Sequence, residues 1–134
     1  MDKNVSLETL LAAPKNIEIN GNTYSLQAYL WRNLMPGEDT KDGLQALVKL
    51  VAEGQESFPS EVNAIYLWVI KEQEVWQTEF LTEERTAPEK NQLEKLAVGG
   101  PNWTGEVTVV VEIYTTNNDK YLLQSPNQKI HKVF

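Results

Sequence analysis

Apolar and polar residues alternate along most of the chain after residue 16. A period of two is typical of strands with one face buried and one face in water. The clearest early example is residues 23–34, in which Tyr29 and Trp31 share one face. The opposite face carries Tyr24, Leu26, Ala28 and Leu30. The pattern predicts one long strand here and a short strand at residues 17–19 before it.

Residues 64–81 are the best candidate for a hairpin. A turn at residues 72–73 pairs Lys71 with Glu74, and every later pair follows from this one. The turn lacks the Gly or Asn that a two-residue loop prefers, so a four-residue loop with the same register is the alternative. The pairs that this register directs toward the core are Val69 with Trp76, Leu67 with Thr78 and Ile65 with Phe80.

The other face of this hairpin is more polar. Trp68 lies opposite Gln77, and Tyr66 lies opposite Glu79. We expect a partly open surface here, unless a second layer of structure covers it.

Residues 92–98 fit two structures. They suit a helix that ends at Gly99, and they also suit a short strand. We favour the strand because the neighbouring segments all alternate with a period of two. The same alternation predicts further strands at residues 44–52, 106–116, 121–124 and 129–134.

The first residues of the chain do not alternate with a period of two. Residues 1–13 have the pattern of a short helix, with Ser6 as N-cap and Pro14 as its stop. Such a short helix is frayed or docked weakly. We therefore predict a helix or arm at residues 1–15 and a single antiparallel β-sandwich domain of about seven strands at residues 16–134.

Composition excludes several classes of function. The 134 residues contain no cysteine, which excludes disulfides, thiolate metal sites and cysteine nucleophiles. The net charge is −7 and no basic run exists, so we expect no nucleic-acid partner. No apolar stretch reaches the length of a membrane span, and the first residues do not resemble a secretory signal. The default expectation is a cytoplasmic protein that does not insert into membranes.

Catalytic and metal-binding patterns are also missing from the sequence. The single histidine, His131, has no Ser or carboxylate arrangement that indicates a triad. The acidic residues in segments 38–42 and 117–119 lack the spacing of a calcium loop, and turn formation explains them. Glu83 and Glu84 are adjacent and form a solvated charge run. We predict no enzyme activity, no cofactor and no metal.

Aromatic residues are the feature that points to binding. Tyr29 and Trp31 share the outer side of one predicted strand, and Tyr66 and Trp68 share the mixed side of another. Exposed aromatic side chains are enriched at contact surfaces and can stack on sugars. The competing interpretation is that these tryptophans pack within the sandwich, as we expect for Trp76.

Four groups of short sequence segments form a pattern: Tyr29-Leu30-Trp31-Arg32 with Met35-Pro36, Leu67-Trp68-Val69-Ile70 with Glu74-Val75-Trp76, Gly99-Gly100-Pro101 with Trp103, and Tyr121-Leu122-Leu123 with Asn127-Gln128. In these segments the chain resembles a family of small bacterial proteins without an assigned activity. The resemblance extends over residues 16–134. The resemblance implies an immunoglobulin-like sandwich and supplies no catalytic residues. The end of the hairpin at Val75 and Trp76 is also similar to small β-sandwich inhibitors of bacterial proteases.

Three functional hypotheses follow. The first is a non-catalytic binding or protein-interaction module with another protein as the partner, which rests on the fold class and on the absence of catalytic patterns. The second is a protease inhibitor that inserts the loop at residues 38–43 or at residues 58–63 into a cleft. The third is binding of a carbohydrate or another small ligand through four surface aromatics: Tyr29, Trp31, Tyr66 and Trp68.

Overall fold

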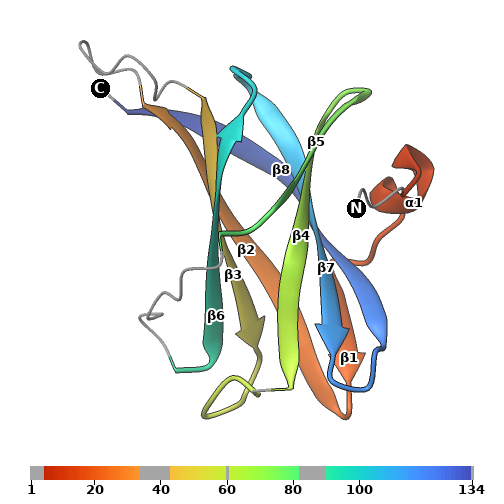
Figure 1. Cartoon of the computed structure of the whole chain (residues 1–134). Helices are drawn as coiled ribbons and strands as arrows, with labels where there is room; N and C mark the ends of the chain where they lie inside the picture. The colour runs from red at the N-terminus through yellow and green to blue at the C-terminus, as the bar shows by residue number, and fades with distance from the viewer. Residues whose placement is uncertain (1–4, 34–42, 60, 82–89, 134) are drawn as a thin grey trace.

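The computed structural model describes residues 5–33, 43–59, 61–81 and 90–133. These residues form an all-β structure of eight strands with one short helix (Figure 1). Their bounds are α1 (Leu7–Leu11), β1 (Asn16–Ile19), β2 (Asn22–Asn33), β3 (Leu44–Ala52), β4 (Val62–Lys71), β5 (Glu74–Glu79), β6 (Gln92–Gly100), β7 (Glu106–Thr115) and β8 (Lys120–Val133).

The strands form one hydrogen-bonded path in the order β5-β4-β7-β8-β2-β3-β6, with β1 paired to β2. We call β1, β2, β3 and β6 half A, and β4, β5, β7 and β8 half B. The long strand β8 joins the halves, because its first part pairs with β7 and its last four residues pair with β2. The β2–β8 pairing is parallel, whereas the predicted sheet was antiparallel throughout.

The path curls until its two edge strands nearly meet. The backbone N–H of Leu81, just after β5, donates to the carbonyl of Leu96 on β6 at 2.9 Å. The sheet is therefore nearly closed, with eight strands rather than the predicted seven or so.

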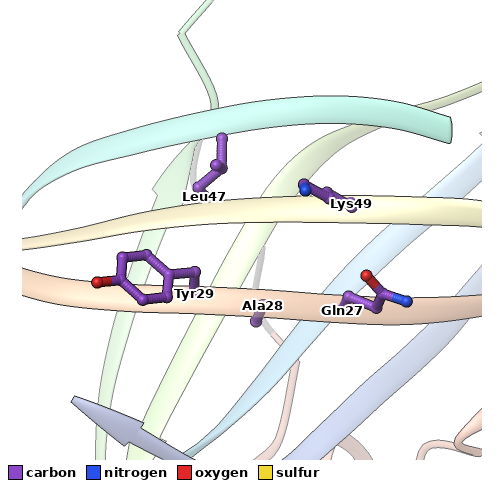
Figure 2. A pocket seen from close by; sticks show the side chains of 5 residues that line it. All are labelled: Gln27, Ala28, Tyr29, Leu47 and Lys49. Atoms are coloured by element: carbon purple, nitrogen blue, oxygen red, sulfur yellow. The ribbon is translucent and has the colours of Figure 1, made fainter. Parts of the chain in front are cut away.

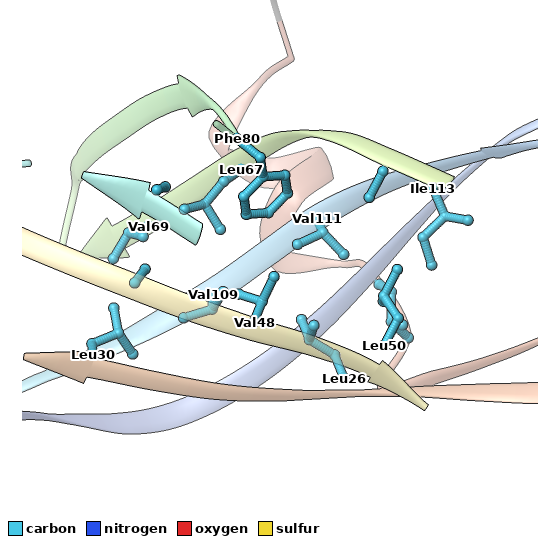
Figure 3. Close-up of a cluster of buried hydrophobic side chains, with 14 of the residues drawn as sticks. Leu26, Leu30, Val48, Leu50, Leu67, Val69, Phe80, Val109, Val111 and Ile113 are labelled. Atoms are coloured by element: carbon cyan, nitrogen blue, oxygen red, sulfur yellow. The ribbon is translucent and has the colours of Figure 1, made fainter. Parts of the chain in front are cut away.

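The main core lies between the two halves (Figure 3). Alternation places the inward residues as predicted in β2, where Leu26 and Leu30 are buried and Ala28 packs against the cluster. Burial of these side chains is the main favourable contribution to folding. The labelled members of the cluster are Leu26, Leu30, Val48, Leu50, Leu67, Val69, Phe80, Val109, Val111 and Ile113.

The predicted register of the β4–β5 hairpin is confirmed. Lys71 pairs with Glu74 and Val69 pairs with Trp76. The two-residue turn forms although it has no glycine, and Glu72 takes a left-handed φ of 58° to close it. A left-handed conformation at a non-glycine residue costs about 1–2 kcal/mol, which the paired strands offset.

The expectation that Ile65 points into the core is wrong. Its side chain is 37% exposed. The pairing of β4 with β7 shifts register between Ala64 and Leu67, which is the position of a β-bulge. An extra residue in one strand breaks the strict alternation of faces, so Ile65 turns outward.

Tertiary structure decided two other features that the sequence left open or divided differently. Residues 92–98 lie within strand β6, as we favoured, and not in a helix. Residues 121–124 and 129–134 were predicted as separate strands, yet most of this region is one strand, β8. The Ser125–Asn127 break appears as a register irregularity opposite Val107 and Val109.

Helix α1 begins where the sequence predicted. Ser6 is the N-cap, and its Oγ accepts a hydrogen bond from the Thr9 N–H at 3.2 Å. This contact satisfies one of the amide groups that a helix start leaves without a partner. The helix lies outside the sheet, against half B (Figure 1).

Candidate functional site

Tyr29 and Trp31 lie together on the outer face of β2, as the alternation predicted. Their ring centroids are 5.4 Å apart. His131 of β8 joins them, because it pairs with Trp31 in the parallel β2–β8 ladder. The His131 ring stacks on Tyr29 with centroids 4.7 Å apart and planes 19° apart. We call these three residues the aromatic strip.

The strip is open to solvent at its centre. Tyr29 is 47% exposed, although it contacts a ring from each of two strands. Stacking restricts the torsions of an aromatic side chain, so the Tyr29 ring is held in place before any ligand arrives.

A shallow hollow of about 260 Å³ lies beside Tyr29 (Figure 2). Leu47 of β3 is the cross-strand partner of Tyr29, and Lys49 is the partner of Gln27. Figure 2 shows these side chains on two neighbouring strands, with the tyrosine ring lying along β2. The hollow, which Ala28 also lines, thus combines the Tyr29 ring and the apolar Leu47 side chain with an amide and an ammonium group.

Tyr66 and Trp68 do not form the second surface that the sequence predicted. Trp68 is only 1% exposed, and it packs with Leu10 and Ala13 of the N-terminal segment. The expectation of an open Trp68 is therefore wrong, because a second layer covers this face of half B. Tyr66 is half-buried beside it, with ring centroids 6.2 Å apart.

The described residues contain no group of three or more His, Asp or Glu side chains that could hold a metal ion. The turn at Asn117–Asp119 closes with a left-handed Asn118 and a hydrogen bond from its N–H to the Thr115 carbonyl. The acidic residues at 38–42 and at 83–84 lie outside the described residues. No helix of the described chain has the length and apolar character needed to cross a membrane.

Among the described residues, Tyr24 of the core has a raised pKa. Burial raises the pKa of Tyr24, a nearby Glu61 carboxylate raises it further, and a hydrogen bond with Asn22 opposes them. Burial disfavours the charged form of a tyrosine, so Tyr24 stays neutral.

Comparison with known protein families, with curated proteins and with solved structures found no match to this chain.

Sequence reasoning missed four members of this site, of which three left a signal and one did not. Gln27, Leu47 and Lys49 occupy outward positions of their strands, which the alternation already indicated. His131 was predicted to lie on the last strand without a catalytic role. Nothing local in the sequence indicated that β8 would run parallel to β2 and bring His131 onto Tyr29.

Proposed function

We propose that the protein is a non-catalytic binding module whose aromatic strip and adjacent hollow take a carbohydrate. The observation that carries the proposal is the half-exposed, pre-stacked Tyr29 ring beside the Gln27 amide and the Lys49 ammonium group.

A sugar ring suits this surface for a physical reason. A pyranose has apolar C–H faces and a rim of hydroxyl groups, so it needs an aromatic face and hydrogen-bonding groups together. Tyr29 offers the first, and Gln27 and Lys49 offer the second. Sites for drug-sized ligands have volumes of about 300–1,000 Å³, so a hollow slightly below that range suits a single sugar ring.

A protein partner is the competing occupant. Tyr and Trp are enriched in protein interfaces, so the strip could also serve as the centre of one. The concave hollow with polar edges favours the sugar. The protease-inhibitor hypothesis gains no support from the loop at residues 58–63, because Phe58 packs against the core and contacts Tyr24 with centroids 5.8 Å apart. The loop at residues 38–43 falls almost entirely outside the described residues.

We further propose that the fold is an immunoglobulin-like sandwich, as in the small bacterial family that the sequence resembles. The strand order supports this. In half B, β5-β4-β7-β8 follow the order C′-C-F-G, and in half A, β2-β3-β6 follow the order A-B-E. The parallel β2–β8 contact then corresponds to a first strand that reaches the last strand and joins the two sheets.

Titration of the ¹⁵N-labelled protein with a panel of neutral and charged mono- and disaccharides tests the carbohydrate proposal. We expect shifts confined to β2, β3 and the end of β8. Tyr29→Ala should weaken binding about tenfold through loss of ring stacking and contact area, whereas Tyr29→Phe should retain it. Val75→Ala, at an exposed position of half B, is the control and should bind as the wild type does.

Two results would overturn the proposal. One is a spectrum that no sugar in the panel changes. The other is a set of shifts on half B that Tyr29→Ala leaves in place. A protein ligand whose affinity depends on Tyr29 would establish the competing occupant instead.

A further inference from the structure

Residues 5–14, here called the N-terminal arm, cover an apolar area on the outer face of half B. Leu10 and Ala13 are buried there, and they pack on three residues of β4 and β7. We call these three residues the seat: Trp68, Ile70 and Val110. Val5 and Leu7 add partly buried contacts at the edge.

Hydrogen bonds from a single residue of β8 hold the end of the arm. The Gln124 backbone N–H donates to the Pro14 carbonyl at 2.8 Å. The Gln124 side-chain amide donates to the carbonyls of Leu11, at 3.0 Å, and of Ala13. The bond to Leu11 satisfies a carbonyl that the end of the helix leaves without a partner, and the other two fix the segment that follows the helix.

The arm depends on the seat for its structure. Helix α1 spans five residues, and isolated helices of that length do not persist in water. The reverse dependence also holds, because removing the arm would expose a large tryptophan, an isoleucine and a valine side by side. Exposed apolar patches of this kind drive association.

The fit between the arm and the seat is incomplete. The Trp68 indole N–H is buried and finds no hydrogen-bond partner among the described residues. A buried donor without a partner destabilises the arrangement that buries it. A groove of about 590 Å³ also lies beside the arm, and its lining includes Ala12 and Pro14 of the arm together with Ile17, Tyr121 and Leu122. Both features indicate an arm that can leave its seat at moderate cost.

We infer that the seat is a second interaction surface and that its occupant in trans is the arm of a second copy of this chain. The arm precedes β1, and its contacts lie outside the main core, so its release leaves the paired strands intact. The released arm of one copy fits the uncovered seat of another, because the same residues pack together within one chain. Two copies can therefore exchange their arms about a two-fold axis. Lys15, between Pro14 and β1, is the connecting position at which the arm would depart. This inference does not rest on the carbohydrate proposal.

A synthetic peptide of residues 1–15 serves as the probe for an arm supplied in trans. The peptide must compete for the seat with the protein's own arm. A substitution that weakens the packing of that arm on the seat should therefore raise the affinity for the peptide by the same factor. In the full-length chain, Leu10→Ala removes the most buried contact of the arm. We expect the peptide to bind this variant about tenfold or more tightly than it binds the wild type. Light scattering of the wild type, warmed and cooled at millimolar concentration, should then show a dimer that micromolar samples lack.

The controls separate exchange from general loosening. Leu11 belongs to the same helix but is 46% exposed, so Leu11→Ala should leave peptide affinity at the wild-type level. A peptide that carries Leu10→Asp should not bind. If Leu10→Ala does not fold, Leu7→Ala at a partly buried position gives a milder weakening and the same direction of change. Equal peptide affinity for all chains, or peptide binding with a wild type that stays monomeric at every concentration, would overturn the inference.

Discussion

The indole ring of Trp76 on β5 lies directly against the backbone of Gly100 on β6. A β-carbon placed on Gly100 would come within 2.7 Å of two ring carbons of Trp76. This contact joins the two edge strands, as does the hydrogen bond from Leu81 to Leu96 further along them. The absence of a side chain at residue 100 therefore allows the sheet to close.

Gly100→Ala should destabilise the protein by about 1–3 kcal/mol, because the added methyl group meets a ring that packs on the core and cannot swing away freely. Urea unfolding measures this cost. A double-mutant cycle with Trp76→Ala supplies the control, since the alanine at 100 should be nearly neutral once the ring is removed. An unchanged cost in the Trp76→Ala background would show that the ring is not the cause.

Trp68→Ala should cost more than Trp76→Ala. Trp68 is 1% exposed beneath the N-terminal arm, whereas Trp76 is only partly buried at the edge of the main core. Truncation of a fully buried tryptophan removes contact area and leaves a cavity, at about 3–5 kcal/mol. Thermal or urea unfolding of the two variants gives the comparison directly. The reverse order would mean that the arm does not cover Trp68 in solution.

Stability should fall as the pH rises above about 10, and Tyr24 should account for part of the fall. Burial raises the pKa of Tyr24 in the folded state above its ordinary value of 10.0. At a pH between 10.0 and the raised pKa of the folded state, the unfolded chain loses the Tyr24 proton and the folded chain keeps it. Deprotonation therefore favours unfolding. Below pH 10 both states keep the proton and Tyr24 contributes no pH dependence.

The measurement is the thermal midpoint of the wild type and of Tyr24→Phe across this pH range. Phenylalanine has no proton to lose, so its midpoint should fall less steeply. Parallel curves would assign the alkaline loss of stability to other groups.

Much of the fold followed from the order of residues alone. The alternation in β2 placed Leu26 and Leu30 inside and Tyr29 outside, because successive side chains of a strand must point to opposite faces. The hairpin register followed from the pairing of Lys71 with Glu74 for the same reason. Ser6 marked the start of α1 because capping is a contact between residues three positions apart.

Tertiary structure decided which aromatic residues form a site. The parallel pairing of β8 with β2 brought His131 onto Tyr29, and docking of the N-terminal arm buried Trp68. The hydrogen bond from Gln124 to Leu11 joins residues 113 positions apart, so no local pattern could indicate it. The bulge that turned Ile65 outward also depends on a partner strand. The sequence by itself determined which face of each strand is apolar. Which of these faces is covered depended on segments far away in the sequence. Their contacts form only in the folded chain, so no local pattern indicates them.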